Sequence, residues 1–296
     1  MPLLPQIEHI TRQDIRLSAH LWSQKGEPLV LLNGGPGMPD YLAPLAGLLT
    51  DDFRVISYDQ RGSGGSRKCK GCYGLKEHVE DLAAVIQALG LAPCHILGHS
   101  WGGLLAQLYA QDYPETVKSL FLCNAMTGVG QDYLRMEPDL LRYYRQAAGS
   151  LGWAKMDLSF LLLWMPGSIG NFGARCLYKQ IWRNFFAFNG TRPKISLSWL
   201  HGINRHAVRH TLMAIVQTDA AWLQPTRLPP YVPVMVLYGD RDVFGPEIQT
   251  VFDRYPWALQ EILPLCGHVP WFHNPIAFAG ILHDFYGQFR IQRQAA

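Results

Sequence analysis

Short apolar runs alternate with longer helical patterns from Pro28 onward, and this alternation limits the fold more than any other feature of the chain. It is typical of a parallel sheet, because parallel neighbouring strands need a crossover connection that is usually a helix. The runs expected to be strands are residues 28–32, 54–58, 94–97, 117–123, 234–238 and 259–263, with an antiparallel pair near 7–10 and 15–22. The expected helices are 41–49, 75–89, 101–113, 246–254 and 275–285. The sequence therefore predicts an α/β protein with a mostly parallel, doubly wound sheet.

Residues 124–233 interrupt this alternation. They contain helical patterns at 140–148, 158–164, 177–188 and 206–217 but no strand between them. A structureless loop of that length inside a compact domain is improbable, so we expect a helical cap over the carboxyl edge of the sheet. The predicted division is a core formed by residues 1–125 and 228–296, with a cap formed by residues 126–227.

Composition excludes several classes of protein. The chain is 48% hydrophobic and 12% aromatic, which is enough for a buried core, and its net charge of +3 does not suggest a nucleic-acid partner. The longest apolar stretch, residues 158–166, is far short of the roughly 20 residues that span a bilayer. The start of the chain lacks the features of a secretory signal, so the expected location is cytoplasmic.

Six cysteines in 296 residues do not form the disulfide framework of a small secreted domain, which agrees with a reducing compartment. Cys69 and Cys72 have the spacing of a redox pair or of half a zinc site, but no second C-x-x-C accompanies them. We expect two thiols in a surface loop and no metal.

The string Gly98-His-Ser-Trp-Gly102 carries the strongest chemical signal. It follows the apolar run 94–97 and opens the helical pattern 104–110, which is the context of a nucleophile elbow. Its glycines let neighbouring backbone approach closely while the hydroxyl is held at a helix N-terminus. Ser100 is therefore the predicted nucleophile.

A serine nucleophile needs a base, and the base needs a third group to orient it. The fold predicts the chain order serine, acid, histidine. The run 234–238 leads into Gly239-Asp-Arg-Asp242, and the run 259–263 leads into Cys266-Gly-His268. Asp240 and His273 compete for these roles. Asp242 is favoured because it lies further into its loop, and His268 because it follows a glycine soon after the strand.

The string Asn33-Gly-Gly-Pro-Gly37 follows the first parallel strand, where this fold supplies a second oxyanion donor. We assign the oxyanion hole to the backbone N–H groups of Gly35 and Trp101. The string lacks the lysine of a P-loop and the spacing of a dinucleotide fingerprint, and the mechanism needs no metal or organic cofactor.

Four strings together resemble those of the prolyl aminopeptidase (proline iminopeptidase) family of α/β-hydrolases, which usually read H-G-G-P-G, D-Q-R-G-x-G-x-S, G-x-S-W-G and a late G-H. Here they stand as Asn33-Gly-Gly-Pro-Gly37, Asp59-Gln-Arg-Gly-Ser-Gly-Gly-Ser66, Gly98-His-Ser-Trp-Gly102 and Gly267-His268. The resemblance covers nearly all of the sheet domain and is much weaker in the cap. It implies an α/β-hydrolase fold and hydrolysis through an acyl-enzyme.

The chain departs from the family in two places. Asn33 replaces the histidine of the oxyanion loop, and Phe188-Asn189-Gly190 stands where the family has a W-E-G string whose glutamate holds the substrate's ammonium group. Asn189 offers only a dipole to a cation. Asp219 or Glu137 is the candidate to replace the missing carboxylate.

Residues 126–227 contain 12 Lys and Arg against 5 Asp and Glu. Either these cations form a solvated outer face, or the cap favours a neutral or anionic substrate. The cap aromatics, among them Trp182 and Phe188, form either an apolar substrate pocket or simply the core of the cap.

The resulting prediction is a serine hydrolase that cleaves a small amide, peptide or ester and resembles proline iminopeptidases. The alternatives are an esterase or thioesterase that needs no free amine, and a ligand-binding receptor that keeps the triad. The expected partner is a small molecule or short peptide, and the sequence leaves the oligomeric state open.

Overall fold

The computed structural model describes residues 4–66, 72–190 and 197–291. Its strands form one sheet with the order β1-β2-β4-β3-β5-β6-β7-β8. β1 and β2 pair antiparallel, as do β2 and β4, whereas the strands from β4 through β3 to β8 are parallel. The bounds are β1 Gln6–Arg12, β2 Ile15–Leu21, β3 Glu27–Leu32, β4 Phe53–Asp59, β5 Cys94–His99, β6 Val117–Cys123, β7 Val234–Gly239 and β8 Leu259–Leu263. The predicted mostly parallel α/β sheet is confirmed.

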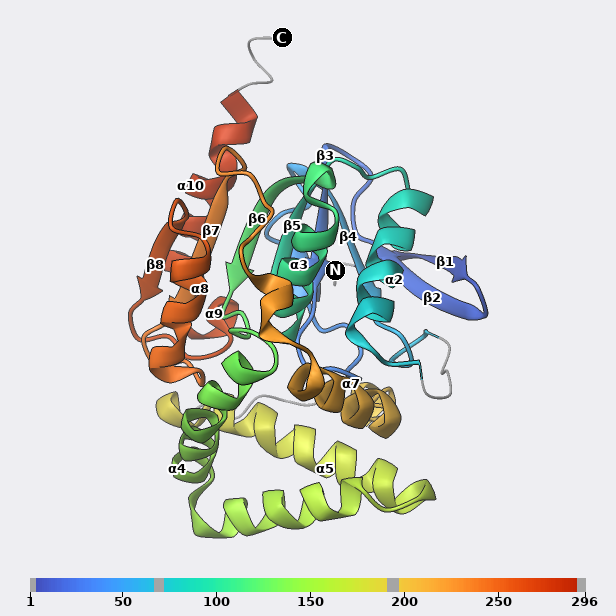
Figure 1. Cartoon of the computed structure of the whole chain (residues 1–296), viewed down its shortest axis with the longest axis vertical. Helices are drawn as coiled ribbons and strands as arrows, with labels where there is room; N and C mark the ends of the chain where they lie inside the picture. The colour runs from blue at the N-terminus through green and yellow to red at the C-terminus, as the bar shows by residue number, and fades with distance from the viewer. Residues whose placement is uncertain (1–3, 67–71, 191–196, 292–296) are drawn as a thin grey trace.

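Ten α-helices are described in these three ranges (Figure 1). They are α1 Ala43–Ala46, α2 Leu75–Ala88, α3 Trp101–Asp112, α4 Gln131–Leu163, α5 Gly167–Phe185, α6 Leu197–His201, α7 Arg205–Gln217, α8 Gln249–Arg254, α9 Pro270–His273 and α10 Pro275–Ile291. Between β6 and β7 the helices are longer than the sequence pattern predicts. α4 runs for 33 residues because two helices continue through a kink at Gly149, whose φ of 62° and ψ of 177° are not helical.

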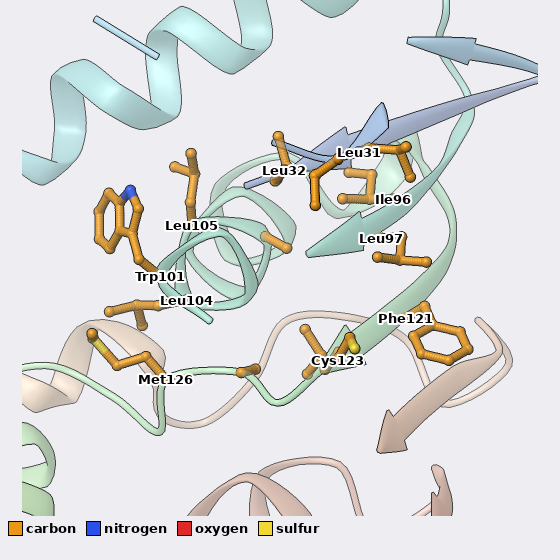
Figure 2. Close-up of a cluster of buried hydrophobic side chains, with 14 of the residues drawn as sticks. Leu31, Leu32, Ile96, Leu97, Trp101, Leu104, Leu105, Phe121, Cys123 and Met126 are labelled. Atoms are coloured by element: carbon orange, nitrogen blue, oxygen red, sulfur yellow. The ribbon is translucent and has the colours of Figure 1, made fainter. Parts of the chain in front are cut away.

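The core that holds the centre of the sheet is apolar on both faces. Figure 2 shows leucines of β3 and β5 and Phe121 of β6 beside α3, from which Trp101 and Leu105 project. These residues are almost completely buried. The turn between β5 and α3 is therefore fixed between two elements that the core holds rigidly.

The cap helices α4, α5, α6 and α7 lie together at one end of the sheet (Figure 1). Hydrogen bonds join them to the loops that follow β3 and β4. The Tyr178 hydroxyl donates to the Pro36 carbonyl at 2.9 Å, and the Asn204 N–H donates to the Gly37 carbonyl at 3.0 Å. The cap helices thus cover loops at the carboxyl edge of the sheet. Domain boundaries at residues 126 and 228 stay a prediction.

One expectation about the cysteines is wrong. Cys72 is disulfide-bonded, so it is not a free thiol. Its predicted companion Cys69 lies outside the described residues. Cys94, Cys123, Cys176 and Cys266 are free. No helix among the described residues is long and apolar enough to cross a membrane.

A buried ion pair fastens the start of α4 to the core. The Arg254 guanidinium contacts the Asp132 carboxylate at 3.2 Å, and the two side chains are 1% and 4% exposed. Arg254 also donates to the Thr127 carbonyl at 2.8 Å and to the Gln107 side chain at 2.5 Å. Several partners thus compensate the cost of burying this charge.

We expect Arg254→Met to lower the free energy of unfolding by about 3 kcal/mol, because Asp132 loses its buried partner and keeps only Arg135, which contacts it at 2.6 Å but is 56% exposed. Urea denaturation followed by circular dichroism measures the change. Arg142→Met is the matched control. Arg142 pairs with Asp139 but its side chain is 67% exposed, so its loss should cost at most about 1 kcal/mol. Equal effects of the two substitutions would contradict the assignment.

Candidate active site

Three loops at the carboxyl edge of the sheet bring Ser100, His268 and Asp242 together. His268 Nε2 lies 2.9 Å from Ser100 Oγ, and His268 Nδ1 lies 2.7 Å from Asp242 Oδ2. Because a carboxylate only accepts, Nδ1–H donates to Asp242 and Nε2 is left to accept the Ser100 proton. The arrangement contains a hydroxyl, a base in hydrogen-bond contact with it and a group that fixes the tautomer of that base.

Asp240 and His273, which compete for these roles in the sequence, hold the loop that carries His268. Asp240 Oδ1 accepts the Cys266 N–H at 2.9 Å. His273 Nδ1 accepts the N–H groups of Gly267 and Val269 at 3.1 and 3.2 Å. Both side chains therefore bond to the backbone on either side of His268 and do not reach Ser100.

Ser100 itself has strained backbone geometry, with φ 57° and ψ −123°. For a residue with a β-carbon this conformation is costly and persists only where the surroundings impose it. The Ser100 N–H donates to the Cys123 carbonyl, and its own carbonyl accepts from Met126, at 3.2 and 2.9 Å. A β-carbon on Gly102 would lie 2.2 Å from the Leu32 carbonyl oxygen, so only glycine fits the close contact of α3 with β3.

Gly35 and Trp101, the predicted oxyanion donors, both line the cavity that contains Ser100 and His268. Gly35 has φ +69°, and a β-carbon there would lie 1.9 Å from Met38 Sδ, so the turn requires glycine. Trp101 opens α3, and the first N–H groups of a helix have no acceptor within it. The Asn33 side chain, at the start of this turn, donates to the Gly34 and Met38 carbonyls at 3.1 and 3.3 Å. These bonds stabilise the conformation of the turn.

A chain of hydrogen bonds joins the oxyanion loop to the backbone of His268. The Gly34 N–H donates to the Tyr41 hydroxyl at 2.8 Å, Tyr41 Oη lies 2.6 Å from His99 Nδ1, and His99 Nε2 lies 2.6 Å from the His268 carbonyl. A carbonyl only accepts, so His99 Nε2 carries the proton and Tyr41 donates to Nδ1. The donor and the acceptor of each hydrogen bond in this series are therefore determined.

His99 remains neutral in this position. Complete burial lowers the pKa of its imidazole well below the usual value, and the neighbouring His268 lowers it further. Protonation of Nδ1 would also replace the acceptor that the Tyr41 hydroxyl requires. Local sequence pattern does not reveal the contacts of His99 with Tyr41 and His268, because they depend on packing across the sheet.

We expect Tyr41→Phe to lower the free energy of unfolding by about 2–5 kcal/mol, because it leaves the Gly34 N–H and His99 Nδ1 buried without their partner. Tyr286→Phe is the matched control: Tyr286 is fully buried, and its hydroxyl has no hydrogen-bond partner among the described residues. Urea unfolding compares the two variants. An equally small decrease in the free energy of unfolding of both variants would contradict the series of hydrogen bonds through Tyr41.

The cavity above Ser100 has a volume of about 460 Å³ and is walled mainly by apolar and aromatic side chains. Trp182 lines it, and its role in substrate binding stays a prediction. Phe185 and Phe244 place their rings 4.4 and 5.3 Å from the His268 ring. These rings keep water away from one side of the imidazole.

Phe188 and Asn189 are not among the described residues that line the cavity. The Phe188 ring packs 4.8 Å from His273 and 5.5 Å below the Arg241 guanidinium. Both residues belong to the short turn Ala187–Asn189 that follows α5, and Phe188 of this turn contacts His273. Their predicted role in substrate binding stays a prediction without a contact to this cavity.

Glu137 and Asp157 are the only carboxylates in the described lining of the cavity. Lysine and arginine are absent from that lining, which agrees with the solvated outer face considered for the basic cap. Asp219 is elsewhere, where its carboxylate accepts the Ala221 N–H at 2.9 Å. The sequence offered one signal for Asp157, which is the only acidic residue between positions 140 and 218.

Among the described residues, no group of three or more His, Cys, Asp or Glu side chains could hold a metal ion. Cys72 is disulfide-bonded, so its sulfur is not available as the thiolate ligand that half a zinc site requires.

Comparison with known proteins identifies the chain as a hydrolase. A family model described as the alpha/beta hydrolase fold matches residues 27–275, and the chain belongs to this family. A Bacillus megaterium epoxide hydrolase, solved in complex with an inhibitor, superposes with a TM-score of 0.70 at 21% identity, covering 95% of this chain and 100% of that one. At this identity the likeness shows the fold alone.

Within the family, the chain resembles proline iminopeptidases. The protein of that name from Clostridium botulinum is 32% identical over 277 residues, which cover 88% of this chain and 89% of the relative. The one from Lactobacillus delbrueckii subsp. bulgaricus is 28% identical over 282 residues, which cover 87% and 89%. The resemblance expected from the four sequence strings is confirmed.

Proposed function

We propose that the chain is a serine hydrolase that cleaves a small amide, peptide or ester through an acyl-enzyme. The observation that carries the proposal is the hydrogen-bonded series Ser100, His268 and Asp242 at the base of an apolar cavity. Ser100 is the nucleophile, His268 is the general base and then the general acid, and Asp242 orients the imidazole.

In the proposed reaction, Ser100 Oγ attacks the substrate carbonyl while His268 Nε2 takes the hydroxyl proton. The Gly35 and Trp101 N–H groups stabilise the oxyanion that forms. Collapse of this intermediate breaks the bond to the leaving group, which receives the proton from His268. Water, deprotonated by the same nitrogen, then cleaves the acyl–Oγ ester and releases the acid.

The favoured substrate carries a free amine. The proline iminopeptidase name of the relatives supports this, and so do the two carboxylates in an otherwise apolar cavity. A buried ammonium needs an opposite charge. Glu137 is the better placed replacement for the missing glutamate, because it lines the cavity and Asp219 does not.

The second candidate is an esterase or thioesterase that does not recognise an amine. The observation that favours it is the replacement of the family's W-E-G glutamate by Asn189. An apolar cavity of this size accepts an acyl chain as readily as an amino acid side chain. The two candidates share the same catalytic residues and differ in the role of Glu137.

We expect Ser100→Ala to reduce turnover by at least about 10⁴-fold, because the acyl-enzyme cannot form. Hydrolysis of a short acyl aryl ester measures the effect. The matched control is Ser119→Ala. Ser119 Oγ also bonds to a buried imidazole, His95 Nδ1 at 2.7 Å, near the opposite end of the strands. Turnover by Ser100→Ala comparable with that of the control would refute the nucleophile.

A comparison of a prolyl arylamide with its N-acetylated form tests the substrate class. We expect the free amine to be preferred and Glu137→Gln to lower kcat/KM for it by about 10–100-fold, the range for a lost charge-assisted hydrogen bond. Hydrolysis of the aryl ester should change little in the same variant. Asp219→Asn is the control because Asp219 lies outside the cavity lining. Indifference to acetylation would favour the second candidate.

A further inference from the structure

Exposed apolar side chains gather on one part of the cap. Leu151 and Leu161 are 71% and 67% exposed, and the segment from α4 into α5 holds further large exposed apolar residues: Leu158, Phe160, Trp164, Met165, Ile169 and Phe172. In Figure 1 the second half of α4 forms the edge of the cap farthest from the sheet. We call residues 151–172 the cap hairpin. An exposed apolar patch of this kind marks an interaction surface.

The second half of α4 is apolar on two opposite sides. Leu151, Leu158 and Leu161 recur at the helical spacing that places them on one exposed face, with Lys155 between them. Trp153, Met156 and Phe160 of the same helix line the cavity. A helix that is apolar all round is normally buried, so the outer face of α4 lacks a covering partner in the isolated chain.

The outer surface of the cap carries an excess of positive charge. Residues 140–218 contain 10 Lys and Arg, none of which is in the described cavity lining, and one acidic residue, Asp157, which lines the cavity and is itself exposed. The Arg209 guanidinium lies 4.2 Å from the centre of the exposed Trp164 ring. The patch is thus a leucine face flanked by cations, the composition of a helix that lies at the surface of an anionic membrane.

We propose that the outer face of the cap hairpin seats on an anionic lipid surface. Leu151, Leu158 and Leu161 enter the boundary between headgroups and acyl chains, and Lys155 contacts the headgroup phosphates. A second copy of the chain is the alternative occupant, and the experiment below distinguishes it from a lipid surface. A nucleic acid would match the charge but leave the leucines in water. The proposal goes beyond the proposed function and does not depend on it.

Flotation of the whole chain with lipid vesicles tests the proposal. We expect binding to vesicles of equal parts phosphatidylcholine and phosphatidylglycerol, weaker binding at high salt, and little binding to phosphatidylcholine alone. The triple variant Leu151→Ser, Leu158→Ser, Leu161→Ser should bind the mixed vesicles at least about tenfold more weakly, because the apolar contribution is lost. Lys155→Gln should weaken binding about fivefold.

The matched control is Leu48→Ser, Tyr231→Ser, Ile276→Ser, which removes three exposed apolar side chains outside the cap hairpin. Circular dichroism and unfolding in urea establish that both triple variants are folded. The proposal is overturned if the mixed vesicles do not bind the unmodified chain, or if the two triple variants bind alike. It is also overturned if sedimentation shows a dimer that only the first triple variant dissolves, since the occupant would then be a second copy.

Discussion

The backbone of Ser100 is the constraint on which the rest of the site depends. Its left-handed φ is unfavourable, and the surrounding structure has to supply the free energy that maintains it. It does so through the buried packing of α3 against β3, β5 and β6, and through backbone hydrogen bonds to Cys123 and Met126 on the strand beside it and the segment that follows. The strain is useful because it turns the hydroxyl out of the core and towards His268.

The other parts of the site are also held by buried polar contacts. The backbone of the loop that carries His268 donates hydrogen bonds to the side chains of Asp240 and His273. The His268 carbonyl accepts a further hydrogen bond from His99 Nε2. The same His99, through Tyr41, reaches the loop that carries Gly35. This series of hydrogen bonds connects the position of the oxyanion loop to the backbone of the proposed general base.

The two sides of the cap helix α4 face different environments. The inner side of α4 supplies apolar walls and two carboxylates to the cavity, while its outer side presents leucines and Lys155. The excess of Lys and Arg in residues 126–227 gave no information about the substrate by itself, because charge counted along a sequence has no direction. Only the structure shows that the described cavity lining contains carboxylates and neither Lys nor Arg.

Local pattern was sufficient to predict the alternation of strands and helices, because the spacing of apolar residues is set within each element. It also placed Ser100, Asp242 and His268 together, since each lies in the segment that follows a recognisable strand and the carboxyl ends of parallel strands share one edge. It could not predict the length of α4, because Pro138 and Gly149 inside this helix are residues that usually end one. It also could not predict that Phe188 and Asn189 are not in the described cavity lining. Tyr41 and His99, 58 positions apart, and His99 and His268, 169 positions apart, meet only when the sheet is assembled. The sequence by itself determined the order of the elements and which polar residues follow the strands, from which the chemistry of the site is proposed. The tertiary structure decided what surrounds these residues, because contacts across the sheet depend on packing rather than on spacing along the chain.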